Sequence, residues 1–279
     1  MKTSPVAGIR PSIIMEQHKH SFTKSEHKIY NYIEENQAKV IYHSLTEFSE
    51  ASGVAEATVL RFLRKLGYKG FQDFKFLLAQ EVAAESVEDQ GDTYVERIRN
   101  NMIRALEDTY DMVDLDALEG SIGAIHGSDD VVIFGIGSSG IAGLDMQHRL
   151  MRIGKNTQVV TDSHFQVMRA TSLDAGSVVV AISLSGGTKD IVDTVRIAKE
   201  RGAAIIVITN YVKSPLTKYA DYILLTSAKE SPLNSGSLVS KVTQLYLIDL
   251  ICTGVTMKNI ESAESIKREV SENISDKLY

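Results

Sequence analysis

The sequence predicts an N-terminal all-α helix-turn-helix domain followed by a five-stranded parallel-sheet α/β/α domain. Up to about residue 77 it reads as short helices separated by turns, with no long strand-like run. From about residue 108, apolar β-branched runs alternate with amphipathic helical segments, which is typical of βαβ units around a buried parallel sheet. A chain of 279 residues is long enough for two such domains.

We expect four segments along the chain. Residues 1–77 form the helix-turn-helix domain, and residues 78–107 form a linker and connecting helix. Residues 108–256 form the α/β domain, and residues 257–279 form a C-terminal helix. The connecting helix is predicted from apolar residues at spacings of three, four and seven: Val95, Ile98, Met102, Leu106 and Val113. The C-terminal helix has one apolar face, made of Ile260, Ala263, Ile266, Val270, Ile274 and Leu278.

Two capping boxes mark helix starts in the N-terminal domain. In each, a Ser or Thr is followed three residues later by Glu, so that side chains and backbone N–H groups satisfy one another. The first box runs from Thr23 to Glu26, and the second runs from Ser44 to Glu47. Gly53 then provides the backbone freedom that a tight turn between two helices needs.

The helix after Gly53 is the candidate DNA reader. Its inward face carries Val59, Phe62, Leu63 and Leu66, and Gly67 ends it. A short helix, a turn and a second helix with a basic outer face place side chains in the major groove of DNA. Arginine pairs with guanine edges, and lysine holds phosphates. With Lys24 of the first capping box, the candidate DNA-binding residues are Lys24, Glu56, Thr58, Arg61, Arg64 and Lys65. A three-helix bundle with a solvated charged face is the alternative.

Five runs predict the strands of the sheet: Val131–Phe134, Gln158–Thr161, Val178–Ile182, Ala204–Ile208 and Tyr222–Leu225. Glycine- and serine-rich loops follow the first and third runs, at residues 135–140 and 183–188. The N–H groups and the positive dipole end of a helix that starts after a strand hold anions, and hydroxyl groups add further donors. Two such loops at one sheet edge therefore predict a site for a small phosphorylated ligand.

A dinucleotide is an alternative ligand for the first loop. Gly135, Gly137 and Gly140 match the dinucleotide-binding glycine pattern, and Asp162 lies near the position of a ribose-binding acid. The second loop, which a dinucleotide does not require, and the adjacent Ser138 and Ser139 favour a phosphate monoester instead. In a further alternative, both loops are only tight turns.

The segment from Val54 to Lys75, which contains Thr-Val, Arg-Phe and Leu-Gly-Tyr-Lys-Gly-Phe, resembles the helix-turn-helix segment of the RpiR family of bacterial regulators. It departs from that family at Ala55, where Ser is usual. If that Ser caps the helix, its loss costs about 1 kcal/mol.

Residues from about 108 to 255 resemble a sugar isomerase (SIS) domain, whose signature is a Ser-x-Ser-Gly-x-Thr loop after a buried strand. Pairing it with this helix-turn-helix is the RpiR architecture. The resemblance implies a sugar-phosphate site made of Ser183, Ser185, Gly186 and Thr188, with Ser138 and Ser139 closing the other side.

Three further ligand contacts are implied by the resemblance alone. His164, in the stretch Thr161-Asp-Ser-His, is similar to a position that amino-sugar-phosphate regulators use to meet the sugar, although a lone histidine is more often a surface or packing residue. Glu230 and Ser240 match a later loop and helix of the family. Ser240 is followed by Lys241, where the family often has Arg; lysine keeps the charge but loses the two-pronged donor geometry.

The resemblance implies a transcriptional repressor of sugar catabolism genes that binds double-stranded operator DNA as a homodimer or higher homo-oligomer. The implied effector is a phosphorylated amino sugar such as N-acetylmannosamine 6-phosphate. The competing interpretation is an SIS isomerase, with Glu230 as the base and His164 for ring opening. An isomerase has no need of a helix-turn-helix, so we expect a regulator rather than an enzyme.

Composition fits a cytoplasmic regulator. Residues 1–80 carry 11 basic and 8 acidic residues, whereas the rest carry 19 and 28, so the two parts differ in charge sign. The single cysteine, Cys252, is predicted to be a buried free thiol, which fits a reducing compartment. We expect no signal peptide, membrane span, cofactor or metal site. His18 and His20 are close in sequence but lie in a segment expected to be mobile.

Overall fold

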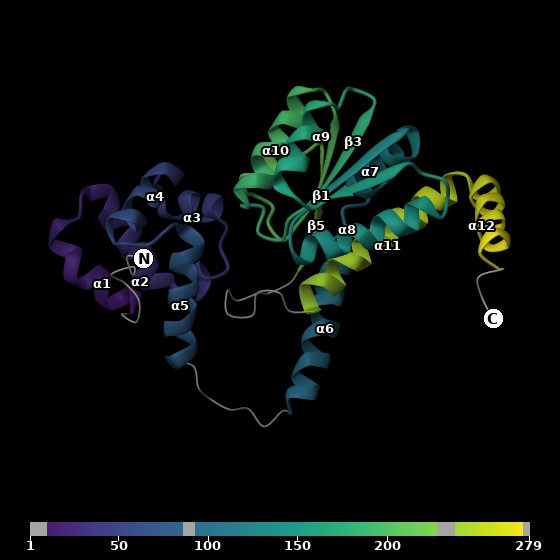
Figure 1. Ribbon diagram of the computed structural model, residues 1–279. Helices are drawn as coiled ribbons and strands as arrows, with labels where there is room; N and C mark the ends of the chain where they lie inside the picture. Colours follow the sequence, from purple (N-terminus) through teal and green to yellow (C-terminus); the bar gives the residue numbers. More distant parts are fainter. Residues whose placement is uncertain (1–9, 86–92, 228–237, 276–279) are drawn as a thin grey trace. The chain divides into compact units, whose positions relative to one another are not determined.

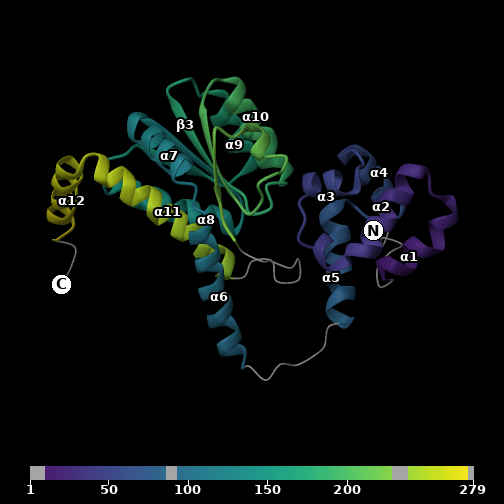
Figure 2. The same ribbon diagram turned by 180° about the vertical axis from the view of Figure 1, so that it is seen from behind.

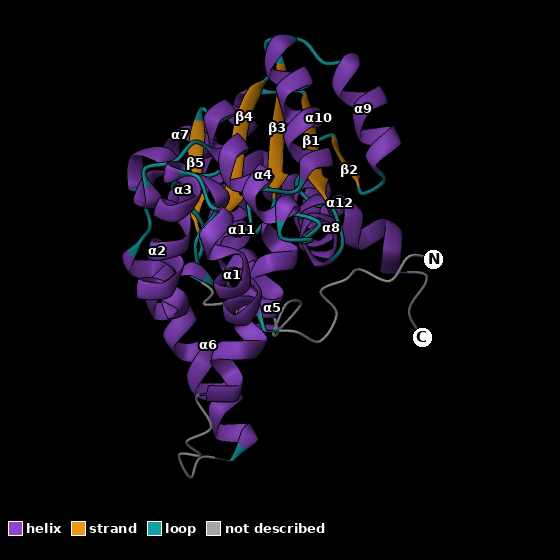
Figure 3. Cartoon of the chain, turned by 90° about the vertical axis from the view of Figure 1, so that its left-hand side faces the viewer, coloured by secondary structure: helices purple, strands orange, loops and turns teal. Residues whose placement is uncertain are grey.

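The computed structural model describes residues 10–85, 93–227 and 238–275, and the chain divides into two compact units with the main boundary between Arg97 and Ile98 (Figure 1). The first unit is helical in its described part, and the strands lie in the second (Figure 3). A helical region followed by a parallel α/β domain is the predicted fold class, which is confirmed.

The helical unit contains five α-helices and one turn of 3-10 helix within residues 10–85: α1 (Pro11–His18), η1 (Lys19–Ser21), α2 (Lys24–Val40), α3 (Leu45–Ser52), α4 (Glu56–Lys65) and α5 (Phe71–Glu85). Both predicted capping boxes are present, at the starts of α2 and α3. Gly53 (φ 65°) and Gly67 (φ 96°) adopt the left-handed backbone that ends α3 and α4.

Aromatic side chains fill the core of the helical unit. Phe48, Phe62 and Phe74 are fully buried, and they contribute one side chain each from α3, α4 and α5. Lys75 is also buried, and its Nζ donates to the carbonyl oxygen of His43 at 2.6 Å, which ties α5 to the start of α3. Burial lowers the pKa of Lys75 to about 8.

The segment around His18 was predicted to be mobile, and that prediction is wrong for the part that forms α1. Ile14 and Met15 are buried against the core of the unit. The backbone N–H of Ser12 donates to the buried carboxylate of Glu81 at 3.2 Å, so α1 is attached to α5. No group of metal-ligating side chains occurs among the described residues.

The second unit contains the sheet and its covering helices, in the order α6 (Tyr94–Asp111), α7 (Leu115–Gly127), β1 (Asp130–Gly135), α8 (Ser138–Met151), β2 (Thr157–Val160), α9 (Ser163–Thr171), β3 (Ser177–Ile182), α10 (Lys189–Glu200), β4 (Ala204–Thr209), η2 (Thr217–Tyr219), β5 (Tyr222–Leu225), α11 (Leu238–Lys258) and α12 (Ile260–Ser275). Only the first residues of α6 precede the unit boundary.

The five strands form one parallel sheet in the order β2-β1-β3-β4-β5, and each corresponds to a run predicted from the sequence. Alternate residues of a strand point to opposite faces of a sheet. Val131 and Ile133 of β1 therefore pack with α7, α8 and α11, whereas Val132 and Phe134 pack with α9 and α10. Figures 1 and 2 show these two helical layers from opposite sides.

Helix α11 is long and apolar enough, by length and composition, to cross a membrane. In the fold its buried residues face α7 and α8 within the larger core cluster, so its apolar character has a structural explanation. Cys252 lies on this buried face as a free thiol, as predicted, and burial raises its pKa to about 12. Helix α12 is attached more lightly: Ala263 is buried, but Ile260 and Ile274 of the predicted apolar face are exposed.

The outer edge of the sheet at β2 is partly covered by a side chain. The N–H of Val159 donates to Oε1 of Gln147 in α8 rather than to another strand. Edge strands otherwise present unpaired N–H and C=O groups to other chains. The contact therefore satisfies one of these groups within the chain.

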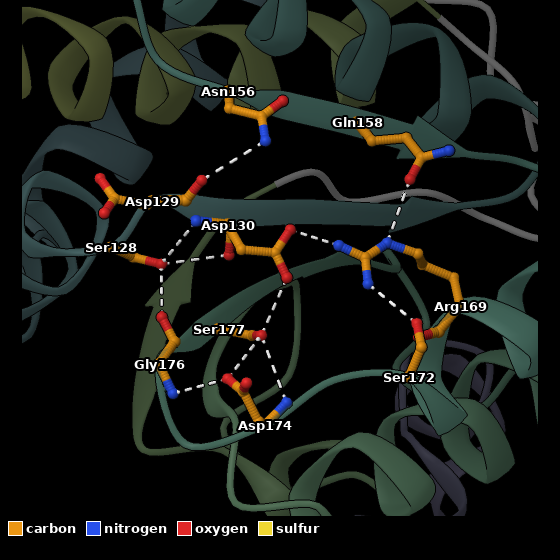
Figure 4. A network of polar contacts seen from close by, with 10 residues as sticks. All are labelled: Ser128, Asp129, Asp130, Asn156, Gln158, Arg169, Ser172, Asp174, Gly176 and Ser177. Carbon is orange, nitrogen blue, oxygen red and sulfur yellow. Dashed lines mark hydrogen bonds and ion pairs between the residues drawn. The ribbon is translucent and has the colours of Figure 1, made fainter.

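A network of polar contacts holds the amino ends of three strands together (Figure 4). Arg169 of α9 forms an ion pair with Asp130 at the start of β1 and donates from Nε to Gln158 of β2 at 3.1 Å. The hydroxyl of Ser177, at the start of β3, donates to the other oxygen of Asp130 at 2.9 Å. Arg169 thus anchors α9 at the amino ends of the strands. The two predicted ligand loops lie at the carboxyl ends, on the opposite side of the sheet.

We predict that Arg169→Met lowers the free energy of unfolding of the α/β unit by about 1–3 kcal/mol, because Asp130 loses its charged donor in a partly buried place. Urea unfolding followed by circular dichroism measures the change. Arg196→Met is the matched control, since Arg196 pairs with Glu200 on an exposed helix face and such pairs contribute little. Equal losses for the two variants would contradict the role of the network.

Candidate functional site

The outer face of α4 carries the arginines that were predicted to read DNA. Arg61 and Arg64 are exposed, while Val59, Phe62 and Leu63 on the opposite face are buried in the core. Nη2 of Arg61 donates to the hydroxyl of Thr58 at 2.9 Å, so these two predicted DNA-binding residues lie together. The face therefore offers two guanidinium groups on a rigid helix.

Two other predicted DNA contacts have partners within the helical unit. Nζ of Lys65 lies 3.0 Å from Oε2 of Glu26 and 3.1 Å from the carbonyl oxygen of Ser21, which ties α4 to α2. The carboxylate of Glu56 accepts a hydrogen bond of 2.7 Å from Thr46 in α3. Both contacts therefore link α4 to the neighbouring elements of the helical unit. Lys24 is exposed in the first turn of α2.

The N-terminus of α4 lacks a side-chain cap. Ala55 occupies the N-cap position (φ −58°, ψ 142°), and its side chain makes no capping hydrogen bond. Ser, Thr, Asp or Asn at this position usually supplies that acceptor. The first turn of α4 is thus less stabilised than the first turns of α2 and α3.

The β1–α8 connection is shorter than the sequence indicated. Ser138, Ser139 and Gly140 belong to the first turn of α8, and the N-cap is Gly137 with a positive φ of 60°. A Cβ at Gly135 would lie 2.8 Å from the carbonyl oxygen of Ser139, and one at Gly140 would lie 2.8 Å from Cγ2 of Thr161. Close packing of α8 on the strands therefore explains both glycines without a dinucleotide.

The β3–α10 loop is held in place by the end of β4. Gly186 has a φ of 56°, and a Cβ there would lie 2.2 Å from Oγ of the buried Ser214. The hydroxyl of Thr209 donates to the carbonyl oxygen of Leu184 at 3.2 Å. Within the loop, the N–H of Gly187 donates to Oγ of Ser185 at 3.3 Å. The loop is therefore preformed by contacts within this domain.

The predicted ligand residues of the β3–α10 loop differ in exposure. Ser183 is buried, Ser185 is half-buried, and Thr188 is exposed as the N-cap of α10. The Thr188 side chain makes no capping hydrogen bond.

The third predicted contribution comes from the end of β2. His164 is exposed in the first turn of α9. The carboxylate of Asp162 accepts from the N–H groups of His164 and Phe165, each at 3.0 Å, so it caps this helix. Oδ1 of the acid that the dinucleotide alternative assigned to a ribose therefore caps α9.

Helix α11 brings a fourth element to the same edge. Ser240 is buried near its start. One turn later, Nε2 of Gln244 donates to Oγ of Ser139 at 3.2 Å, which places the beginning of α11 against the first turn of α8. Sequence analysis missed Gln244. A buried glutamine inside an apolar helix was the available signal. Glu230 lies outside the described residues.

The carboxyl ends of β1, β2 and β3 therefore share one edge with Ser138, Ser139, His164, Ser183, Ser185 and Thr188. In an open parallel sheet, ligands bind outside the carboxyl ends where the strand order reverses. That reversal lies between β1 and β3, which are the neighbours that carry the two serine-rich connections.

Comparison with known proteins identifies both units. The model of the SIS domain matches residues 124–254, and the model of the helix-turn-helix domain of the rpiR family matches residues 12–85. An HTH-type transcriptional regulator of Clostridium perfringens is 38% identical over 259 residues, covering 89% of this chain and 93% of the relative. The chain belongs to the RpiR family.

Two further relatives span nearly the whole chain. The RpiR regulator of Escherichia coli is 29% identical over 264 residues, covering 92% of this chain and 88% of its own length. The NanR protein of Vibrio vulnificus, solved in complex with ManNAc-6P, has a TM-score of 0.88 at 27% identity and covers 96% of this chain and 98% of its own. This RpiR-family chain is a transcriptional regulator with an SIS domain, as predicted.

A serine at the N-cap position tests the account of the start of α4. We predict that Ala55→Ser raises the free energy of unfolding of the helical unit by about 1 kcal/mol, because its hydroxyl accepts from the first turn. Thermal unfolding followed by circular dichroism measures this. Ala57→Ser places the same hydroxyl inside the first turn, where it has no capping role. The account is wrong if both serines have the same effect.

The preformed β3–α10 loop gives a second prediction for the RpiR-family chain. Gly186→Ala should destabilise the α/β unit by about 1–3 kcal/mol, because alanine is strained at this positive φ and its Cβ meets Ser214. Chemical denaturation is the measurement. Gly187→Ala is the control, since its nearest neighbour would be the Ser185 oxygen at 3.7 Å, an ordinary contact. A Gly186→Ala protein as stable as this control would contradict the clash.

Proposed function

We propose that this RpiR-family protein is a cytoplasmic repressor of sugar catabolism genes, and that its SIS domain binds a phosphorylated amino sugar. N-acetylmannosamine 6-phosphate is the proposed effector. The observation that carries the proposal is the gathering of serine and threonine side chains at the β1/β3 reversal, in a chain that also has a DNA-reading helix.

The chemistry of the sheet edge supports a phosphate monoester. Ser138, Ser139 and Ser185 offer hydroxyl donors beside the amino ends of α8 and α10, where backbone N–H groups and the helix dipole favour an anion. Lys241 is half-buried in the first turns of α11 and places a positive charge next to Ser240, another predicted ligand residue. Similarity to the NanR protein complexed with ManNAc-6P supports the choice of an amino-sugar phosphate, which would place the regulated genes in sialic acid catabolism.

Arg61 and Arg64 are the proposed readers of operator bases. Lys24 and Lys65 are proposed to contact DNA phosphates. The proposed interface also includes Glu56 and Thr58, which lie on the same helix as the arginines. A single reading helix covers only a few base pairs, so specific recognition favours a homodimer on a palindromic operator. Its half-sites would lie about one helical turn apart, or a multiple of it. Sedimentation equilibrium of the full chain tests this proposal.

Thermodynamic linkage describes how the effector could release the protein from operator DNA. A ligand changes DNA affinity only if it binds the DNA-competent and DNA-incompetent arrangements unequally. Coupling free energies of about 1–3 kcal/mol are typical, which corresponds to about 5–150-fold in operator affinity. We propose that the sugar phosphate favours the incompetent arrangement.

Isomerase activity is the second candidate, favoured only by the shared SIS fold. His164 lies at the sheet edge, but the proposed base Glu230 lies outside the described residues. The relatives that cover most of the chain are named transcriptional regulators, which supports a sensor that releases its ligand unchanged. Conversion of an added hexose phosphate by the purified protein would favour the enzyme instead.

Variants of the two units should affect DNA binding and the response to the sugar phosphate independently. Arg61→Ala should weaken binding to genomic fragments retained by the wild-type protein about tenfold or more, because a base contact contributes about 1–3 kcal/mol. Its affinity for N-acetylmannosamine 6-phosphate should stay within twofold. Ser185→Ala with Thr188→Ala should abolish release from DNA and leave DNA binding intact. Gel-shift titrations and calorimetry measure both quantities.

Thermal shift provides the ligand control. A ligand at about 100 times its Kd stabilises by about 2.7 kcal/mol, so binding is readily seen. N-acetylmannosamine, inorganic phosphate and NAD(H) are the comparison compounds. A shift with NAD(H) alone would replace the proposed sensor with a dinucleotide sensor, and a loop double variant that still responds to the sugar phosphate would exclude the proposed site.

A further inference from the structure

Gln244 is a buried polar side chain in the apolar core helix α11. It is 2% exposed, and Leu247 and Ile248 on the next turn are fully packed in the core. Burying an amide costs free energy unless it forms hydrogen bonds. Its amide nitrogen meets Oγ of Ser139, 105 residues earlier in the chain, at 3.2 Å. This contact joins α11 to the turn of α8 that faces the proposed phosphate.

The direction of this hydrogen bond determines what Ser139 can offer a ligand. A serine hydroxyl has one hydrogen and two lone pairs, whereas the amide nitrogen of glutamine only donates. When Gln244 donates to Oγ, one lone pair of Ser139 is occupied and its hydrogen stays available to another acceptor. A phosphate oxygen is such an acceptor.

Burial makes this orientation effective. Ser139 is 8% exposed, so water competes little for its hydroxyl. Ser139 lies in the first turn of α8, close to the backbone N–H groups at the start of that helix. A hydroxyl that is oriented before the ligand arrives pays less ordering entropy on binding.

We propose that Gln244 is a positioning residue for the sugar-phosphate site: it accepts no proton and touches no ligand, but it holds the Ser139 hydroxyl in the orientation that donates to the phosphate. This inference rests on the proposed function, because it concerns the same site. It adds a residue on α11 that controls whether the Ser139 hydroxyl, after the β1–α8 connection, can donate to the ligand.

Two substitutions test the direction of the hydrogen bond. Gln244→Met keeps a similar volume but removes the donor, and should weaken binding of N-acetylmannosamine 6-phosphate about tenfold, the equivalent of one lost hydrogen bond. Gln244→Glu is measured over a rising pH series, because burial raises the pKa of a carboxyl. Once ionised it only accepts, so it takes the Ser139 hydrogen and should weaken binding more strongly than Gln244→Met. Isothermal titration calorimetry of the full chain gives the Kd values. Wild-type affinity in Gln244→Met, or an affinity of Gln244→Glu that does not fall as the carboxyl ionises, would overturn the proposal.

A double-mutant cycle separates positioning from a purely structural role. If Gln244 acts through Ser139, then Ser139→Ala and Ser139→Ala with Gln244→Met should have the same Kd, because the second change has nothing left to orient. Independent losses that multiply would overturn the inference. Gln147→Met in α8 is the matched control: it also removes a glutamine hydrogen bond, to the N–H of Val159, and should leave Kd within twofold.

Folding and function are checked alongside. Circular dichroism melts show whether each variant is folded, and Gln244→Asn, which keeps the amide but is too short to reach Ser139, replaces Gln244→Met if that variant unfolds. Wild-type protein that binds N-acetylmannosamine 6-phosphate, with folded Gln244 variants that bind equally well, would overturn this inference and leave the proposed function standing. Wild-type protein that binds neither this ligand nor inorganic phosphate would overturn both.

Discussion

The reversal of strand order between β1 and β3 is the constraint on which the sensor unit depends. After β1 the chain adds β2 on one side, then returns to place β3 on the other side and continues outward to β5. Helix α8 therefore leaves toward one face of the sheet and α10 toward the other. Two helix starts therefore face the same point, where polar backbone groups attract an anion.

Close packing around that point leaves little freedom in the surrounding backbone. Gly135 and Gly140 let α8 approach β1 and β2 more closely than any side chain would allow, and Gly186 lets the second loop approach Ser214. The Arg169 network fixes the opposite end of α9, so the first turn of that helix, with His164, is carried on an anchored element. The candidate ligand residues are thus supported by contacts outside the site.

Local sequence signals predicted much of this structure. The five strands followed from buried β-branched runs, and the starts of α2 and α3 followed from capping boxes, because both signals act within a few residues. Helix α1 was missed because its stability depends on burial of Ile14 and Met15 and on Glu81, far along the chain. The hydroxyl-rich loops were recognisable, but the partner of Ser139 was not, since a pattern in α11 does not reveal which distant side chain it meets.

The contact between Gln147 and the N–H of Val159 limits how the sheet could grow. A strand from a second molecule that added alongside β2 would have to displace the glutamine and forgo the bond it makes. Continuous sheets across several molecules, the route to fibrillar aggregates, are therefore disfavoured at this point. Association of two molecules along β2 would then depend on side-chain contacts. Such contacts are more specific and more reversible than a ladder of backbone hydrogen bonds.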